Sequence, residues 1–391
     1  MRVTHLSLTD FRNYKSAELD LVPGPNLFVG SNGQGKTNLV EALGYLSTLG
    51  SHRVSTDHAM IRSDCDSAIV RARVSNAEQS VLVELQLNRV GANRAQINRS
   101  AIKTRELPRH FSSVLFAPED LALVRGEPSG RRRFLDELLV LRAPRMSGVL
   151  ADYDRVLRQR NSLLKSARAS GARGQLSTLD IWDERLVDLG TEIIGSRADL
   201  VGELSPEVEL AYAAIAGDHH AASLANQLSI LSSTSDDLDA AVAQEEIHRD
   251  RLTAEQTREA FRAALARVRR AELERGITLA GPHRDDLVLT LNALPARGYA
   301  SHGESWSFAL SLKLASAAVL RRDSNSGDPV LILDDVFAEL DESRRDRLAD
   351  AIEGFEQVLI TAAVGGDVPV RLAGHSVLIR GGEIMEGGED A

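Results

Sequence analysis

The stretch at residues 30–37, with the sequence GSNGQGKT, constrains this 391-residue chain more than any other feature. It matches the pattern G-x-x-x-x-G-K-[ST] of a phosphate-binding loop, in which glycines let successive backbone N–H groups point at phosphate oxygens. The apolar residues 25–29 predict a strand that enters the loop, and residues 38–46 predict a helix that leaves it. A flexible Gly/Ser turn is the structural alternative, but the strand–loop–helix setting favours a nucleotide site. We expect that site to be lined by Gly30, Ser31, Asn32, Gly33, Gln34, Gly35, Lys36, Thr37 and Asn38.

Two consecutive carboxylates near the other end of the chain complete the pattern. Residues 329–333, PVLIL, form the near-continuous apolar run that a central parallel strand needs, because both of its faces are covered. Asp334 and Asp335 follow at the carboxyl end of that strand. We expect Asp334 to hold Mg²⁺ together with the hydroxyl of Thr37. The expected catalytic residues are Lys36, which would bridge the β- and γ-phosphates, and Asp335, which would orient the attacking water. Two solvated carboxylates at a strand end are the alternative interpretation.

The spacing of these two signals predicts a split α/β fold. They lie nearly at opposite ends of the chain, whereas simple phosphate-loop kinases and GTPases carry them much closer together. We therefore expect a nucleotide-binding head built from residues 1–126 and 276–391, with a helical lobe at 127–275 inserted between them. Alternating residues predict strands at 3–8 and 17–22, and three further strands at 68–75, 80–88 and 91–98 that we expect to form an antiparallel side sheet. The remaining core strands are expected at 113–116, 287–291 and 356–361.

The inserted block shows apolar residues at three- and four-residue spacing. This pattern predicts about five helices, and because no heptad repeat is sustained, any coiled-coil arm is short. Residues 228–231 are expected to form a short strand within the block. After the last core strand at 356–361, we expect the tail from Gly381 onward to fray.

Composition and charge bear on the cell compartment and on the partner. The single cysteine, Cys65, excludes an internal disulfide framework and suits a reducing cytoplasm. Neither a membrane-spanning run nor a leader sequence is apparent, so we expect a cytoplasmic protein with no membrane partner. The formal net charge is −10, yet residues 131–173 hold eleven Lys/Arg against four Asp/Glu. A solvated helix face is one interpretation of that excess, and a DNA-backbone contact is the other. The candidate DNA contacts are Arg131, Arg132, Arg133, Arg155 and Arg158.

A second anion-binding helix start is physically plausible at residues 300–305, where a small-residue turn opens a helix expected at 305–321. An ordinary capped helix is the alternative interpretation of this turn.

Five motifs in the same order resemble one known family. They are GSNGQGKTN at 30–38, FAPEDL at 116–121, GEPSGRRRFLD at 126–136, GPHRDD at 281–286 and LILDDVFAELD at 331–341. Together they resemble the bacterial RecF family of recombination mediators, which are ABC-type ATPases related to the structural-maintenance-of-chromosomes (SMC) proteins. The resemblance covers essentially the whole chain.

The resemblance implies an ABC-type head with a mixed central sheet, an antiparallel side sheet and a helical lobe. It implies ATP and Mg²⁺ as cofactors, a homodimer that closes around ATP, and slow hydrolysis that is modulated by DNA and serves as a switch. It further implies binding to gapped DNA or single-strand–duplex junctions and, with partner proteins, loading of the strand-exchange recombinase during replication, repair and the SOS response to DNA damage.

The resemblance also assigns roles to residues far from the phosphate loop. The signature motif maps to Ser301, His302, Gly303 and Glu304, and is expected to contact the γ-phosphate bound by the opposite subunit. Asp341 occupies the dimer-contacting turn. Two departures stand out. Glu304 replaces a glutamine, so it turns away, binds metal or weakens dimer closure. Thr361 stands where transporter heads carry a switch histidine, which predicts slow turnover.

Two other functions remain open from the residues alone. The phosphate loop and Asp334 would equally suit the ATPase subunit of a membrane transporter, although the insertion is long and the signature lacks tandem glycines. A small-molecule phosphotransferase would need an acceptor pocket, which nothing in the sequence indicates.

Overall fold

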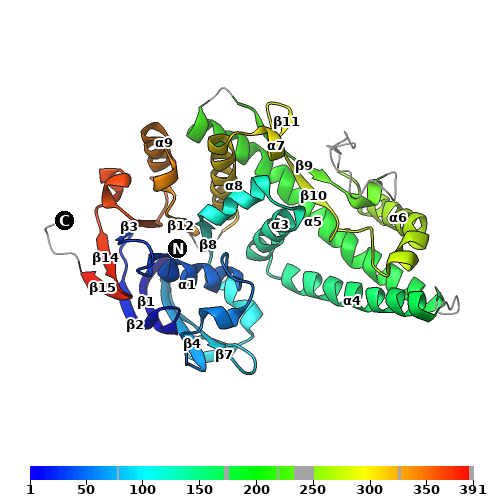
Figure 1. Cartoon of the computed structure of the whole chain (residues 1–391), viewed down its shortest axis with the longest axis horizontal. Coiled ribbons are helices and arrows are strands. Elements are labelled where there is room, and N and C mark those ends of the chain that lie inside the picture. The colour runs from blue at the N-terminus through cyan, green and yellow to red at the C-terminus, as the bar shows by residue number, and fades with distance from the viewer. Residues whose placement is uncertain (77–78, 171–175, 218–219, 233–250, 325–326, 387–391) are drawn as a thin grey trace. The chain divides into compact units, whose positions relative to one another are not determined.

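The computed structural model describes residues 1–76, 79–170, 176–217, 220–232, 251–324 and 327–386 (Figure 1). The chain divides into two compact units: residues 1–125, 207–222 and 299–391 form the first, and residues 126–206 and 223–298 form the second. The first unit therefore draws on both ends of the chain, but two boundaries differ from the expectation. Residues 276–298 belong to the second unit rather than to the head, and residues 207–222 belong to the first rather than to the lobe. Among the described residues, no helix is both long and apolar enough to cross a membrane.

The first unit contains an antiparallel sheet with the strand order β2-β1-β4-β5-β6-β7. Its strands alternate buried and exposed residues, as the sequence predicts for a sheet with one solvated face. The strands are β1 (Arg2–Phe11), β2 (Tyr14–Asp20), β4 (Ser67–Ser75), β5 (Ser80–Asn88), β6 (Arg94–Ile97) and β7 (Ser100–Ile102).

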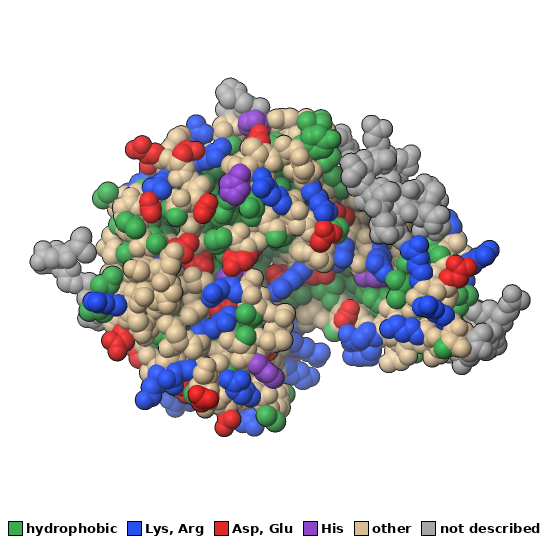
Figure 2. Space-filling view, viewed as in Figure 1, with side chains coloured by type: hydrophobic (Ala, Val, Ile, Leu, Met, Phe, Trp, Pro, Cys, Tyr) green, Lys and Arg blue, Asp and Glu red, His purple; other side chains and the backbone are tan. Residues whose placement is uncertain are grey.

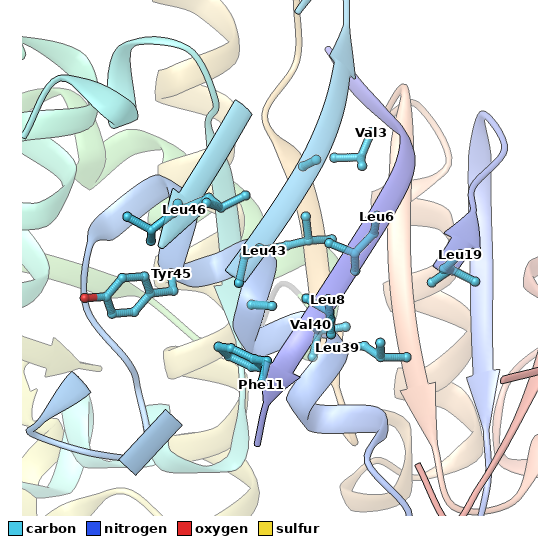
Figure 3. Close-up of a cluster of buried hydrophobic side chains, with 14 of the residues drawn as sticks. Val3, Leu6, Leu8, Phe11, Leu19, Leu39, Val40, Leu43, Tyr45 and Leu46 are labelled. Carbon is cyan, nitrogen blue, oxygen red and sulfur yellow. The ribbon is translucent and has the colours of Figure 1, made fainter. Parts of the chain in front are cut away.

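Helix α1 (Lys36–Thr48) packs on the inner face of this sheet. Figure 3 shows its Leu39, Val40 and Leu43 beside Leu6 and Leu8 of β1. These side chains are at most 1% exposed, and burying each contributes roughly 1.5–3 kcal/mol. The helix that begins at the phosphate loop is thus anchored along its length by the antiparallel sheet.

The second sheet of this unit carries the nucleotide signals. Its order is β15-β14-β3-β13-β12-β8, and all neighbours run parallel except the β14–β15 pair. Every residue of β12 and β13 is buried, which explains their unbroken apolar runs. The strands are β3 (Gly24–Val29), β8 (Ser113–Phe116), β12 (Val330–Asp334), β13 (Gln357–Ala362), β14 (Ser376–Arg380) and β15 (Glu383–Glu386); the helices of the unit are α2 (Leu121–Arg125), α8 (His302–Asp323) and α9 (Glu342–Ile352).

The C-terminal end of the chain corrects the sequence prediction. β13 is not the last core strand, because β14 pairs in parallel with β3 and buries Val377 and Ile379. The tail does not fray at Gly381 either. Gly381 and Gly382, both with positive φ, form the turn of the β14–β15 hairpin, which continues to Glu386. The alternation of residues 376–380 is the signal that was missed.

The second unit is mainly helical, with α3 (Pro128–Arg142), α4 (Met146–Ser170), α6 (Ala254–Arg275) and the first part of α5 (Leu176–Ala216). The described residues thus hold fewer helices than the five expected, because α5 is a single 41-residue helix. The expected strand at 228–231 is wrong: Ser229–Leu231 is a 3-10 turn that follows β9 (Ala222–Gln227). β9 forms a small sheet with β10 (Asp286–Leu291) and β11 (Leu294–Pro295), against which α3 packs, and this pairing places residues 276–298 in the second unit. The irregular turn α7 (Ala296–Tyr299) follows.

A buried arginine joins the helices of the second unit. Arg160 of α4 is fully buried, and its guanidinium donates to Asp183 of α5 at 2.7 Å and to Glu272 of α6 at 2.6 Å. Its third contact is the hydroxyl of Thr278, at 2.8 Å. An ion this deeply buried is tolerated because two carboxylates compensate its charge and each of its three nitrogens meets an acceptor. The cluster therefore fixes the register of three helices.

Candidate nucleotide-binding site

The phosphate loop lies between β3 and α1, as the sequence predicts. Gly33 and Gly35 have φ values of 81° and 118°, which side-chain-bearing residues rarely adopt. At Gly35, a Cβ would also lie 2.7 Å from the side-chain nitrogen of Asn13 and from the hydroxyl of Tyr14. Glycine at this position therefore meets both a conformational and a steric requirement. The loop begins on the central sheet, where the N–H of Gly30 donates to the carbonyl of Ala362 at 3.3 Å.

Lys36 lies folded over the loop. Its side chain is nearly fully buried, and Nζ donates to the carbonyl oxygens of Gly30 at 2.6 Å and Ser31 at 3.4 Å. These carbonyls hold the ammonium above the curled backbone, where phosphate oxygens can replace them as partners. The position agrees with the role predicted for Lys36.

A three-residue hydrogen-bonded cluster connects the loop to the carboxylates. The hydroxyl of Thr37 donates to Asp334 Oδ1 at 3.0 Å, and the hydroxyl of Thr361 donates to the same oxygen at 2.6 Å. Thr361 lies next to Asp334 because β12 and β13 pair in parallel with these two residues in register. Asp334 is almost fully buried, and this burial raises its pKa to about 6 despite the two hydroxyl donors. The nearby carboxylates of Asp335 and Glu119 act in the same direction.

Asp335 adopts a strained conformation beside this cluster. Its φ is 52°, which is uncommon for a residue with a side chain, and its N–H donates to the hydroxyl of Thr361 at 2.9 Å. Its Oδ1 is buried and has no hydrogen-bond partner among the described residues. Strain of this kind persists where surrounding contacts impose it and is frequent at functional sites. The free carboxylate oxygen is compatible with the water-orienting role predicted for Asp335.

Two residues near Asp334 were missed by sequence reasoning. His52 Nε2 lies 4.0 Å from Asp334 Oδ2, and burial lowers the pKa of this imidazole. Glu119 was named only within the motif FAPEDL, without a role at the site. β8 pairs in parallel with β12 and aligns Phe116 with Leu333. The turn at residues 118–120 and Asp334 therefore lie at the same edge of the sheet, directly after these two aligned residues. The signal for Glu119 was the second short apolar strand, which ends at the same edge of the sheet.

The start of α1 is held by an arginine that the sequence did not single out. Arg12 donates to both carboxylate oxygens of Glu41, at 2.8 and 2.6 Å. Burial opposes ionisation of Glu41, but the hydrogen bonds from Arg12 and Ser51 outweigh it and lower the pKa of this carboxyl. Arg53 donates to Asn38 at 2.9 Å, so this loop arginine reaches the helix turn directly behind the phosphate loop.

The C-terminal hairpin holds the outer side of the phosphate loop. The N–H of Gly382 donates to the backbone carbonyl of Gln34 at 3.0 Å, and the N–H of Gly381 donates to its side-chain carbonyl at 2.5 Å. Asn13 donates to the same backbone oxygen at 3.2 Å and accepts from Asn38 at 2.8 Å. Gln34 therefore serves as the attachment point between the loop and the end of the chain.

The predicted signature motif forms a capped helix start. Ser301 is the N-cap of α8: its Oγ accepts from the N–H of Glu304 at 3.3 Å, and Glu304 Oε2 accepts from the N–H of Ser301 at 2.7 Å. This reciprocal arrangement is a capping box. The hydrogen bonds from Ser301 lower the pKa of Glu304, so its carboxylate stays charged and is turned back onto the helix terminus. The departure at residue 304 thus has a local structural explanation.

The turn at Asp341, which is predicted to contact the second subunit, lies beside this helix start. Asp341 is the N-cap of α9 and accepts from the N–H of Arg344 at 2.9 Å. The guanidinium of Arg344 passes so close to Gly303 that a Cβ there would lie 2.7 Å from its Nη1. Ser301, Gly303 and Asp341 therefore belong to one region of the first unit. His302 accepts from the indole N–H of Trp306 at 3.1 Å. Among the described residues, no hydrogen bond or ion pair joins Ser301–Glu304 to the phosphate loop of the same chain.

Two of the five candidate DNA contacts, Arg131 and Arg132, require a correction, and the other three stay predictions. Arg131 is 4% exposed and forms a two-point ion pair with Asp286, at 2.7 Å for both contacts, so it is not available to a phosphate backbone. Arg132 donates to the carbonyl of Asp285 at 2.7 Å. The remaining three are exposed, but each pairs with a carboxylate on its own helix: Arg133 with Glu137, Arg155 with Asp152 and Arg158 with Asp154. The arginines between residues 131 and 160 therefore all have partners within the unit.

A family model described as the RecF/RecN/SMC N-terminal domain matches residues 2–366. The DNA replication and repair protein RecF of Clavibacter sepedonicus is 65% identical, over 99% of this chain and 95% of that protein. The chain belongs to the RecF family. Membership in this family removes the basis for the transporter and phosphotransferase alternatives.

Solved structures support the same assignment. A structure of the recombination mediator protein RecF with ATP, in the RecFOR pathway, matches with a TM-score of 0.87 and 29% identity, and covers 99% of this chain and 97% of that one. An SMC head bound to the C-terminal winged-helix domain of ScpA matches at a TM-score of 0.54 and 14% identity, over 100% of this chain and 98% of that one, which shows the shared fold alone. The predicted ABC-type head of the RecF and SMC kind is confirmed.

The residues present fit Mg²⁺ and a nucleotide. Thr37 and Asp334 place a hydroxyl and a carboxylate 3.0 Å apart, and hard oxygen ligands of this kind suit Mg²⁺, which takes few protein ligands and completes its shell with phosphates and water. The fit rests on the donors of this chain rather than on the family alone.

Proposed function

We propose that this chain is an ATP-dependent DNA-binding recombination and repair mediator of the cytoplasm. It binds Mg²⁺–ATP at residues 30–38, dimerises around the nucleotide, binds gapped DNA or single-strand–duplex junctions, and helps partner proteins to load the strand-exchange recombinase. The carrying observation is the hydrogen bond from Thr37 to Asp334, which joins two signals 297 residues apart into one site. The relatives support the DNA-repair part of the proposal through their names.

The residues of the site divide the work between binding and turnover. The backbone N–H groups of the loop and Lys36 bind the phosphates, and Thr37 with Asp334 would hold the metal, which neutralises charge on the phosphates. Asp335 accepts a hydrogen bond from the attacking water and orients it. The hydroxyl of Thr361 hydrogen-bonds to the carboxylate of Asp334 and to the N–H of Asp335, so it positions both residues. Unlike the switch histidine of transporter heads, it carries no imidazole. Slow hydrolysis, used as a switch, follows from this arrangement.

Dimer closure depends on Ser301, Gly303 and Asp341 in this proposal. The N-terminus of α8 carries a partial positive charge that favours the γ-phosphate bound by a second subunit. Because Glu304 is held in the capping box, its carboxylate need not approach that phosphate. Nucleotide contacts supplied by both subunits would make closure and hydrolysis interdependent.

The direct test measures ATPase activity and dimerisation on the same samples, with and without gapped duplex DNA. We expect Mg²⁺–ATP to convert monomer to dimer and gapped DNA to change the hydrolysis rate. A chain that stays monomeric with Mg²⁺–ATP at micromolar concentration would contradict the closing dimer, and a rate that is indifferent to DNA would contradict the DNA-linked switch.

A further inference from the structure

Six cations on one part of the first unit have no side-chain partner among the residues that the structure describes. Most arginines of this acidic chain contact a carboxylate or a backbone carbonyl, including those of the segment 131–160. Six other cations differ. Their side chains form no hydrogen bond and no ion pair within 4.0 Å in the described part of the chain; they are Arg73, Arg94, Arg99, Lys103, Arg105 and Arg109. All six side chains are exposed. We call these six residues the basic surface.

Strand register brings four members of the basic surface, Arg73, Arg94, Arg99 and Lys103, to the solvated face of the antiparallel sheet; the other two follow in the 3-10 turn Thr104–Arg109 beside β6. Arg73 of β4 and Arg94 of β6 point to solvent, because their strand neighbours Ala72, Val74 and Ala95 are buried. The pairing of Ala95 with Ile102 places Arg94 opposite Lys103. Like charges directly opposite each other on neighbouring strands are destabilising. The two cations are therefore held together without a carboxylate that would explain their proximity.

Arg99 occupies a position that favours glycine. It follows Asn98 in the β6–β7 turn, and the two residues have φ values of 67° and 50°. Two-residue hairpin turns with positive φ at both positions prefer Asn followed by Gly, because glycine adopts this conformation without a steric cost. The chain instead keeps a cation, Arg99, at the second position. This cation lies in the same row of the sheet as Arg73, because Leu82 pairs with Arg73 on one side and is hydrogen-bonded to Asn98 on the other.

The carboxylates nearby are mostly engaged elsewhere. Glu84 is bound by Arg71, and Asp57 accepts from Asn93 at 2.7 Å. Glu18 and Asp20 bind His5, the cross-strand neighbour of Arg73, and Glu106 lies in the 3-10 turn Thr104–Arg109 between Arg105 and Arg109. Figure 2 shows Lys and Arg side chains gathered over the part of the first unit where β4 and β7 lie in Figure 1. A local excess of positive charge thus persists on a chain whose net charge is −10.

We propose that the basic surface binds the phosphate backbone of duplex DNA. The inference rests on the proposed DNA-linked function and assigns it to a surface other than the segment 131–158. Duplex is favoured over single strands because residues 51–110 contain no Phe, Tyr or Trp, and sequence-tolerant single-strand binding depends on aromatic stacking. The distance from β4 to β7 is three strand spacings, about 14 Å, which is comparable to the roughly 12 Å width of the major groove. The cations can therefore contact phosphates of both strands.

The test is a salt titration of duplex binding with a quadruple variant, Arg94→Ala, Arg99→Gly, Lys103→Ala and Arg105→Ala. A matched control removes four exposed cations that each pair with a carboxylate: Arg145→Ala, Arg155→Ala, Arg158→Ala and Arg270→Ala. Fluorescence anisotropy with labelled duplex and with a single strand of the same sequence is followed from about 50 to about 200 mM salt, in the presence of ATP. ATP affinity and thermal unfolding are measured on every variant. The single variant Arg99→Gly removes a cation and also the backbone strain at this position, so it checks that DNA binding is weakened without loss of folding.

We expect the quadruple variant to lose at least tenfold in duplex affinity and to flatten the slope of log affinity against log salt by up to about 3.6, since each phosphate contact contributes about 0.9. The control and the ATP affinity should stay at the parent values. If the quadruple variant kept the parent's duplex affinity and salt slope, DNA binding by the basic surface would be overturned while the proposed function stayed intact. An equal loss of duplex affinity in the control variant would have the same meaning. Loss of single-strand binding alone would overturn the assignment to duplex. A parent chain that binds no DNA would overturn the surface and the proposed function together.

Discussion

Replacing Thr361 with valine tests whether one hydroxyl positions both carboxylates of the site. Valine keeps the β-branched shape of threonine on a fully buried strand, so the change removes hydrogen bonds and little else. In the parent chain this hydroxyl donates to Asp334 at 2.6 Å and accepts from the N–H of Asp335 at 2.9 Å. The variant therefore loses a bond to a buried carboxylate and leaves a backbone donor without a partner.

The expected cost follows from these two losses. A hydrogen bond to a charged group contributes about 1.5–3 kcal/mol, and an unsatisfied buried donor costs about 1–3 kcal/mol. We take about 3 kcal/mol as the net loss, which lowers the unfolding midpoint of a unit of this size by roughly 6–12 °C. The hydrogen bond from Thr361 also lowers the pKa of Asp334, which burial has raised to about 6. Removal of this hydrogen bond raises that pKa further, so at neutral pH a larger fraction of the carboxyl is protonated and Mg²⁺ binds more weakly. The loss of Mg²⁺ affinity relative to the parent should shrink as pH increases.

The assay combines differential scanning calorimetry with ATPase rates measured over a range of Mg²⁺ concentrations and pH. Thr361→Ser, which keeps the hydroxyl, is the matched control and should stay close to the parent in Mg²⁺ requirement. The reasoning is refuted if the valine variant unfolds at the same temperature as the serine variant and shows the same Mg²⁺ dependence.

Three further predictions address binding, the hairpin and the helical unit. Lys36→Ala should lose ATP affinity and dimerisation together, whereas Asp335→Asn should bind ATP normally, hydrolyse it slowly and prolong the dimer in gel filtration; a parent hydrolysis rate in Asp335→Asn would assign the water to another residue. Gln34→Ala removes the acceptor for Gly381 while keeping the backbone acceptor for Gly382, so it should raise the KM for ATP several-fold with a smaller change in kcat; an unchanged KM would show that the hairpin does not support the loop. Arg160→Met leaves Glu272 buried without a cation and Asp183 with Arg269 alone, and should cost roughly 3–5 kcal/mol in urea unfolding. Arg270→Met, at a 91% exposed site, should leave stability unchanged. Equal effects of the two changes would show that the buried cluster does not stabilise the unit.

The parts of the fold that sequence predicted are those with strong local patterns. The phosphate loop, the buried strand before Asp334 and the alternating strands of the side sheet each combine a period with a clear end signal. The hairpin at residues 376–386 was missed because its strands are short and follow two glycines and several small residues that resemble a frayed end. Its pairing with β3 is a long-range contact that no local pattern contains.

The candidate site was predicted in part for the same reason. Thr37, Asp334 and Asp335 are found by motif, but the role of Thr361 depends on the parallel register of β12 and β13, and that of Glu119 depends on the position of β8 beside β12. Charge counting along the chain failed for Arg131 because its partner, Asp286, lies 155 residues away. Whether a cation is free depends on the fold, and the sequence alone does not reveal it.

The central claim is that each ATP is held by the loop of one subunit and the signature helix of another, and mixing two inactive variants tests it most directly. Asp335→Asn stops hydrolysis at the site of its own loop but keeps ATP binding, dimerisation and the signature. Ser301→Asp keeps an N-cap residue on α8 but places a carboxylate where the partner's γ-phosphate would bind. In a two-fold symmetric dimer, random mixing makes half of the dimers mixed, each with one intact composite site, so about a quarter of the parent ATPase activity should return. A mixture that stays as inactive as its two components would contradict the shared site.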